Sequence, residues 1–211
     1  MLFLVDIFEF LIQQHMKKIL LASVIACFTF TTMTAQSERS VRYDDWLFSI
    51  GINTINSLGT KNPFESPSDW AFRVPLMASI ESKFFDYFTI EAGISLNGFE
   101  ENIRLDAAGP PSDDITYFSV DTAIKYYFGE YIFPDTEWID FYGSAGLGFF
   151  LLDDANIAFN FGGGALFWLN RSRTFGLKLQ GLGKFAFDHS DRGSVYPNNH
   201  FQYSIQAVFK L

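Results

Sequence analysis

The twelve residues HFQYSIQAVFKL, which run from His200 to Leu211, decide the fold of this chain. The odd-numbered residues of this stretch are apolar or aromatic, and the even-numbered ones are polar except for Val208. Alternation with a period of two predicts a β-strand with one apolar and one polar face. At the edge of a sheet in water such an aromatic strand would invite aggregation, so a closed barrel in lipid is its natural setting.

Seven other segments repeat this alternation, each close to the length of about 9–11 residues with which a tilted strand crosses a bilayer. The eight predicted strands cover 46–53, 72–81, 88–97, 118–127, 138–149, 157–169, 175–187 and 200–211. We expect the last strand to pair with the first, which removes both edges. The predicted fold class is all-β, an eight-stranded antiparallel up-and-down transmembrane β-barrel.

The polar faces of these strands favour lipid over water outside the barrel. A water-soluble, lipocalin-like barrel would carry many Lys, Glu and Thr side chains on its polar face. Here that face is rich in small residues, which suit a narrow interior. They are Ser49, Gly51, Asn53, Gly93, Ser95, Asn97, Ser144, Gly146, Gly148, Asn160, Gly162 and Gly164. Phe and Leu dominate the opposite face, as contact with lipid requires.

The composition and the N-terminus agree with an exported membrane protein. Hydrophobic residues make up 48% of the 211 residues, with 26 Phe, yet no long apolar run after the N-terminus predicts a spanning helix. Translation from Met16 would give a signal peptide over 16–35, with 1–15 as a mis-called upstream extension and 36–211 as the barrel. The alternatives are an amphipathic N-terminal helix and lipidation at Cys27, the only cysteine.

The predicted connections alternate in length. Those at 54–71, 98–117 and 188–199 are long, whereas those at 82–87 and 170–174 are short, which is typical of an outer-membrane barrel with long outer loops. The turn at 128–137 is intermediate, and the loop at 151–156 is shorter than this pattern predicts. Pro75 falls within a predicted strand, so we expect a bulge or local opening there.

Charged residues occur on the polar faces of the strands. The predicted inward-facing charges are Arg73, Glu81, Glu91, Asp121, Lys125, Asp140, Lys178, Lys184 and Lys210. Since buried ions must be paired, we expect an ion-pair network that fills the lumen and argues against a wide ion-conducting pore. The alternative is that some of these charges are solvated at the rims, above all Glu81 and Lys210. Trp138 and Trp168 also have inward parity and are candidate lumen plugs.

Most of the net charge of −9 falls in the four predicted outer loops. The simplest interpretation is a solvated, self-repelling rim, and the alternative is that divalent cations bridge the loops to anionic lipid headgroups or polysaccharide. The acidic balance disfavours nucleic-acid binding.

The sequence predicts no catalytic, cofactor-binding or metal-binding residues. His189 and His200 remain after loss of the leader, but neither has the spacing of a catalytic or metal site. Gly162-Gly163-Gly164 is not a phosphate loop, because no helix follows it.

The eight segments together resemble the outer-membrane barrels of the OmpA/OmpX type over 43–211. The resemblance rests on Asp45-Trp46, Gly51-Ile52-Asn53, Trp70 and the closing segment from His200. That segment is similar to the terminal signal read by the barrel-assembly machinery, although such signals usually end in Phe and this one ends in Leu211. OmpA-type chains often continue into a peptidoglycan-binding domain, and that function is not carried over here.

The resemblance and the residues together imply a non-enzymatic protein of the Gram-negative outer membrane. Its expected partners are outer-membrane lipid and lipopolysaccharide, and the barrel-assembly machinery during insertion. Alternative functions are OmpW-like passage of small apolar molecules through a lateral gap near Pro75, and a subunit of a larger envelope complex docking through 128–137. A lipid-modifying enzyme with a His-centred cluster is a further alternative.

Overall fold

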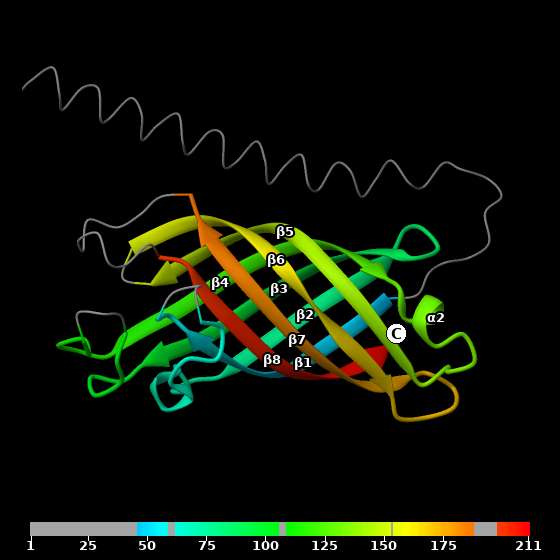
Figure 1. Cartoon of the computed structure of the whole chain (residues 1–211), viewed down its shortest axis with the longest axis horizontal. Helices are drawn as coiled ribbons and strands as arrows, with labels where there is room; N and C mark the ends of the chain where they lie inside the picture. Colours follow the sequence, from blue (N-terminus) through cyan, green and yellow to red (C-terminus); the bar gives the residue numbers. More distant parts are fainter. Residues whose placement is uncertain (1–45, 59–61, 106–108, 153, 188–197) are drawn as a thin grey trace, which may run out of the picture. The chain divides into compact units, whose positions relative to one another are not determined.

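A computed structural model describes residues 46–58, 62–105, 109–152, 154–187 and 198–211. Eight antiparallel strands follow one another around a closed barrel (Figure 1). The strands are β1 (Trp46–Asn56), β2 (Leu76–Lys83), β3 (Phe88–Phe99), β4 (Ile115–Tyr127), β5 (Ile139–Leu152), β6 (Asp154–Trp168), β7 (Phe175–Ala186) and β8 (His200–Lys210). A short 3-10 helix η2 (Pro67–Asp69) lies in the first long loop, and a one-turn helix α2 (Gly129–Ile132) lies between β4 and β5. This confirms the predicted fold class.

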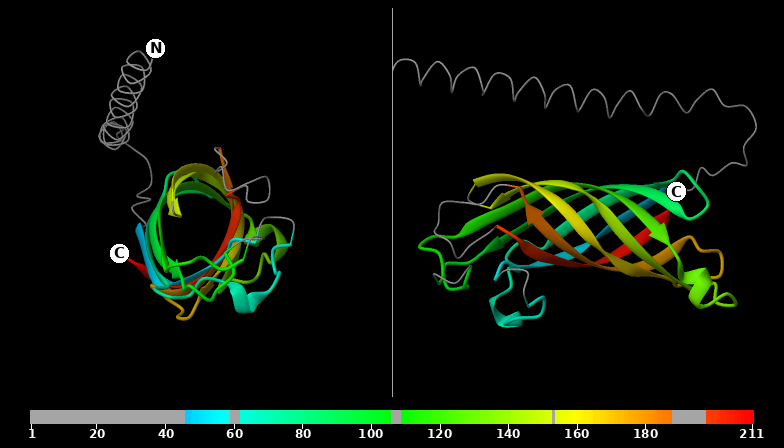
Figure 2. Two further views of the ribbon diagram at one scale, coloured as in Figure 1. Left: turned by 90° about the vertical axis from the view of Figure 1, so that its left-hand side faces the viewer. Right: turned by 45° about the horizontal axis from the view of Figure 1, so that its top comes forward.

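The closing strand pairs with the first strand, as predicted. β8 and β1 are in register from Lys210 opposite Leu47 to Phe201 opposite Asn56. We call the end of the barrel that carries the short turns the turn end, and the opposite end, which carries the long loops, the loop end. The N–H of Leu211 donates to the carbonyl of Trp46 at 2.9 Å, which continues the pairing to the turn end. Figure 2 shows the resulting ring of strands in an end-on view. The aromatic strand therefore has no free edge.

The barrel is apolar outside and polar inside. Outward-facing Ile94 and Phe161 are 53% and 60% exposed, whereas inward-facing Ser49 and Gln206 are fully buried. A continuous exposed apolar wall of this kind would be unstable in water, and a lipid bilayer is the solvent that it fits. The transmembrane barrel is thus confirmed over the water-soluble alternative.

Some predicted boundaries are wrong. The segment 72–81 is not one strand, because β2 begins only at Leu76, directly after Pro75. The N–H of Leu76 instead donates to the carbonyl of Val74 at 2.8 Å, and Pro75 has no N–H to offer a ladder. The predicted loop at 151–156 is also wrong, because β5 extends to Leu152 and β6 begins at Asp154.

Two asparagine side chains bridge the interruption at Pro75. Asn53 Nδ2 donates to the carbonyls of Leu76 at 2.7 Å and Leu96 at 3.1 Å. Asn97 Nδ2 donates to the backbone carbonyl of Asn53 at 3.0 Å, to its side-chain oxygen at 2.8 Å and to the carbonyl of Ala71 at 3.2 Å. These amides supply donors where the backbone ladder between β1, β2 and β3 lapses, so the wall stays hydrogen-bonded.

We expect Asn97→Ala to lower the free energy of unfolding by about 1–3 kcal/mol, because it leaves buried carbonyls without donors. Urea unfolding of the barrel in lipid vesicles, followed by tryptophan fluorescence, measures this change. Asn102→Ala, at an exposed position of the second long loop, is the control and should have little effect. Equal stability of the two variants would contradict the bridging role of Asn97.

Inward-facing glycines allow the wall to curve. A Cβ on Gly162 would overlap the carbonyl oxygen of Gly181 and lie 2.9 Å from Cα of Leu182, both on β7. A Cβ on Gly164 would likewise overlap the carbonyl oxygen of Leu179. Closing only eight strands requires sharp local bending, and glycine kinks permit it.

Candidate functional site

The barrel interior holds two groups of paired charges. One lies toward the turn end and involves Glu81, Glu91, Lys125 and Lys178, and the other lies toward the loop end around Asp121 and Lys184. All six side chains are at least nine-tenths buried, and three carboxylates face three ammonium groups. The expectation of an interior ion-pair network is therefore met by these residues.

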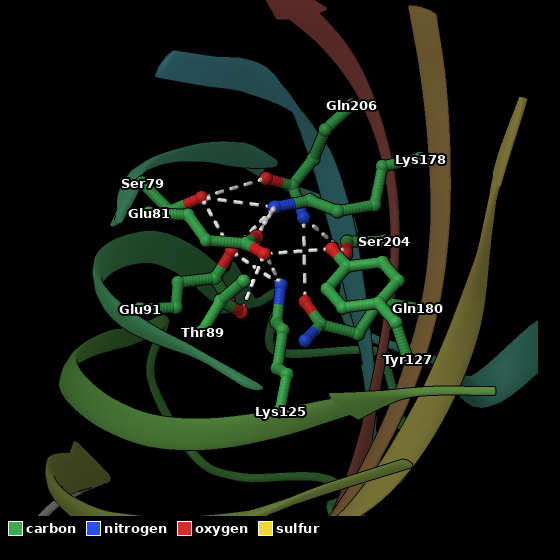
Figure 3. Close-up of polar contacts among 10 residues, drawn as sticks. All are labelled: Ser79, Glu81, Thr89, Glu91, Lys125, Tyr127, Lys178, Gln180, Ser204 and Gln206. Atoms are coloured by element: carbon green, nitrogen blue, oxygen red, sulfur yellow. Dashed lines mark hydrogen bonds and ion pairs between the residues drawn. The ribbon is translucent and has the colours of Figure 1, made fainter. Parts of the chain in front are cut away.

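Lys125 on β4 is the centre of the turn-end group (Figure 3). Its Nζ lies 2.8 Å from Glu81 Oε2 and 2.7 Å from Glu91 Oε2, which belong to β2 and β3. Lys178, on β7 across the lumen, also pairs with Glu91 and donates to Ser79 Oγ at 3.2 Å. The Lys125–Glu81 pair and both contacts of Lys178 link strands that are not neighbours in the sheet, so these charges cross-brace the barrel.

Neutral groups complete the hydrogen bonds of the same carboxylates. Glu81 Oε1 accepts from the hydroxyls of Thr89 and Tyr127, each at 2.7 Å. The Lys125 ammonium lies 4.5 Å from the centre of the Tyr142 ring. The alternative that Glu81 is solvated at the rim is wrong, because its side chain is only 1% exposed. Burial of this ion requires the dense set of partners that it has.

The loop-end group joins Lys184 on β7 to β4. Lys184 Nζ donates to both carboxylate oxygens of Asp121, at 2.9 and 2.7 Å, and to Ser119 Oγ at 2.9 Å. It also donates to the Tyr117 hydroxyl at 3.1 Å. Asn160 on β6 donates to Asp121 Oδ1 at 2.7 Å. The group therefore ties three strands together with no excess charge.

His200 extends this group toward the loop end. Its Nε2 is 2.9 Å from the Tyr117 hydroxyl, and its Nδ1 is 3.1 Å from the carbonyl of Asn198. Because Lys184 donates to that hydroxyl, the arrangement is satisfied when Tyr117 donates to Nε2 and Nδ1–H donates to Asn198. The ring is fully buried and serves as a packed link rather than as an accessible base. His189 lies outside the described residues.

An apolar cluster occupies the loop end of the interior. Its buried members are Ile55, Ala71, Phe99, Leu105, Tyr117, Phe150, Leu152, Ala158 and Ala186. Leu105 comes from the second long loop, and its carbonyl accepts a hydrogen bond from Ser57 Oγ. This apolar cap was not predicted, although continuing the alternation past the predicted strand ends would place Ile55, Phe99 and Phe150 inward.

Other residues predicted to face inward lie elsewhere. Arg73 is at the loop end, half-exposed, and pairs with Asp114 at 2.8 Å. Asp140 is half-buried and accepts from the N–H groups of Gly129 and Phe141, so it holds the turn that contains α2. Lys210 is exposed, as the rim alternative predicts.

The two candidate tryptophan plugs differ. Trp138 is 58% exposed and stacks on Phe167 at 6.2 Å between ring centres, so its prediction as a lumen plug is wrong. Trp168 is half-buried and lies next to inward-facing Gly176. Together with Asp135, Glu137, Arg171 and Arg173 they line a shallow depression at the turn end.

Two other features are absent from the described residues. No group of three or more His, Cys, Asp or Glu side chains among them could hold a metal ion. Within the same residues, no helix is long and apolar enough to cross a membrane.

Comparison with known proteins relates this chain to solved structures at the level of fold. No protein-family model matches it, and no curated protein does. Neisserial surface protein A is 12% identical, with a TM-score of 0.51 over 79% of this chain and 96% of that one. Escherichia coli outer membrane protein W is 13% identical, with a TM-score of 0.49 over 81% of this chain and 100% of that one. Ail of Yersinia pestis is 14% identical, with a TM-score of 0.45 over 80% of this chain and 99% of that one.

Proposed function

We propose that this chain, which has the fold of an OmpA/OmpX-type outer-membrane barrel, is a non-enzymatic integral protein of the outer membrane with a plugged lumen. It stabilises the envelope and presents acidic loops at the surface. The observation that carries the proposal is the interior, where charges are paired across the lumen and the loop end is filled by an apolar cap. Such an interior braces a wall and leaves ions little room.

The balance of interior charge supports a structural role. A conducting lumen needs hydrated groups to which ions bind weakly, whereas here each carboxylate is held by a lysine within 2.8 Å. His200 is fully buried and Tyr117 covers its Nε2, which supports a non-enzymatic role. These contacts are those of a core rather than of a binding pocket.

The partners we propose follow from the two surfaces of the barrel. The exposed apolar wall suits outer-membrane lipid, and the closing β8 strand suits recognition by the barrel-assembly machinery. At the loop end, acidic residues of the second long loop line a depression of about 590 Å³ with Arg73. They are Glu100, Glu101, Asp113 and Asp114. These carboxylates by themselves form no metal site, so this rim suits contact with lipopolysaccharide through cations that are shared with the lipid phosphates. The turn around α2 suits a periplasmic or envelope-complex partner.

OmpW-like passage of small apolar molecules is the second candidate, and Pro75 is the observation that favours it. Passage through the wall needs an opening at the place where the backbone hydrogen bonds between strands are interrupted, next to Pro75. The amides of Asn53 and Asn97 bridge this place and hold it closed. We therefore favour the structural role.

Planar-bilayer recordings test the plugged lumen. We expect no large steady current from the native barrel, because its ionic layer and its apolar cap act as two seals in series. Truncating the cap with Phe99→Ala and Phe150→Ala, or removing one pair with Glu91→Ala and Lys178→Ala, should each leave conductance low. All four changes together should raise it.

Heat-modifiable gel mobility provides the folding control for every variant, since a folded barrel runs compactly when it is not boiled. A large, steady current through the folded native protein would contradict the proposal. A freely soluble monomer after removal of the leader would contradict the membrane location.

A further inference from the structure

The first long loop folds back over the outside of the barrel. We call residues 62–72 the loop-one flap; it follows β1 and contains η2. In both views of Figure 2 the flap (cyan) lies beside the strands rather than over the mouth of the ring. Its position places loop residues against the wall that faces lipid.

Hydrogen bonds from two strands fasten the flap across the β1–β8 seam. Asn56 Nδ2, at the end of β1, donates to the carbonyl of Pro63 at 3.0 Å. The hydroxyl of Tyr203 on β8 donates to the same carbonyl at 2.6 Å. Within the flap, Trp70 Nε1 donates to the carbonyl of Glu65 at 2.8 Å. These bonds fix the flap to both strands of the seam and close it on itself.

Aromatic rings form the contact between flap and wall. The Tyr203 ring stacks on Trp70 at 5.0 Å, on Phe64 at 5.7 Å and on Phe201 at 6.1 Å, all within 20° of parallel. Tyr203 has outward parity, since its neighbours Gln202 and Ser204 are buried in the lumen. The stack therefore continues the lipid-facing wall near its loop end.

Two aromatic side chains of the flap are uncovered. Phe64, a member of the stack, is 71% exposed, and Phe72, at the end of the flap, is 58% exposed. Trp and Tyr, with an apolar ring and one polar atom, concentrate where acyl chains meet headgroups. Trp70 and Tyr203 occur together in this stack, and the outer surface of the flap is continuous with the apolar wall of the barrel, which we assign to lipid.

We propose that the loop-one flap is a lipid-interface anchor, lying along the barrel wall at the boundary between acyl chains and headgroups. It covers the outer part of the β1–β8 seam and fixes the depth of the loop end in the bilayer. The inference rests on the proposed membrane location of the barrel.

Brominated phospholipids test the anchor with Trp70 as the probe. Trp46→Phe, Trp138→Phe and Trp168→Phe leave Trp70 as the only tryptophan of the four in the chain. In vesicles, we expect bromines near the carbonyl end of the acyl chains to quench Trp70 emission more than bromines near the chain ends. Acrylamide in the water phase should quench it weakly.

A reference probe separates this inference from the membrane location. Ile94→Trp, with all four native tryptophans changed to Phe, places the probe on the outward face of β3. Bromine quenching of that probe is expected wherever the barrel spans the bilayer. Loss of its quenching would overturn the proposed function, whereas loss at Trp70 alone would overturn only the anchor.

Matched variants test the ring stack in the Trp70-only protein. Tyr203→Ala should release the flap, shifting Trp70 emission to longer wavelength and reducing its quenching by lipid. Phe209→Ala, at another outward aromatic of β8 but near the turn end, should leave both unchanged. Strong acrylamide quenching of Trp70 in the unmodified flap would place it in water and overturn the proposal. If neither brominated lipid nor acrylamide quenches Trp70, the anchor proposal is also overturned, and the flap would instead contact a second copy of the chain.

Discussion

Lys125→Met is expected to lower the free energy of unfolding by about 3–5 kcal/mol, because it leaves a buried charge without its partner. Lys125 is fully buried and pairs with both Glu81 and Glu91. Methionine fills a similar volume but has no charge, and Lys178 alone then faces two carboxylates. Urea unfolding in phospholipid vesicles, with gel mobility as a second readout, measures the loss.

Two further variants show whether charge or packing causes this loss. Arg73→Met breaks the half-exposed pair with Asp114 and should cost no more than about 1 kcal/mol. Lys125→Met combined with Glu81→Gln restores the charge balance and should recover part of the stability. If the double variant is no more stable than Lys125→Met alone, the charge explanation fails.

Gly162→Ala is expected to destabilise the barrel by about 3 kcal/mol or more, since the new methyl group meets backbone rather than a movable side chain. The added Cβ would overlap the carbonyl oxygen of Gly181 on β7. Relief requires the β6–β7 pairing to move apart, which opens the ladder. The fraction of protein that reaches the compact, heat-modifiable form after refolding measures the effect.

Gly143→Ala provides the matched control for this glycine. No heavy atom outside its chain neighbours lies within 4 Å of a Cβ built on Gly143, which belongs to the adjacent strand β5. The change should alter stability by no more than about 0.5 kcal/mol. Similar losses at both positions would mean that general strand flexibility, and not close approach at Gly162, limits folding.

Local pattern predicted most of the fold. The alternation that begins at His200 identifies the strand and its two faces, because the side on which a residue projects depends only on its position along the strand. Its partner follows from the need to remove both edges. The failures lie where the alternation and the backbone ladder disagree. Pro75 interrupts the ladder without breaking the alternation, and the polar residues Asp154 and Asn156 indicate a loop although β6 already begins at Asp154.

The candidate site was only partly predictable. The sequence indicated that Glu91, Lys125 and Lys184 face inward and must be paired, since an isolated charge is too costly to bury. It did not indicate which pairs form. Glu81 looked like a rim residue because it lies near a strand end, yet the Tyr127 hydroxyl and Lys125 enclose it.

The sequence by itself determined the strand number, the inside-out polarity and the near neutrality of the interior, because all three follow from residue type and strand parity. Only the tertiary structure decided how Lys125 meets Glu81 and Glu91, how the apolar cap fills the loop end and how the loop-one flap lies on Tyr203. Those contacts join distant parts of the chain. They depend on strand tilt and register around the closed barrel, which the alternation within any one strand does not encode.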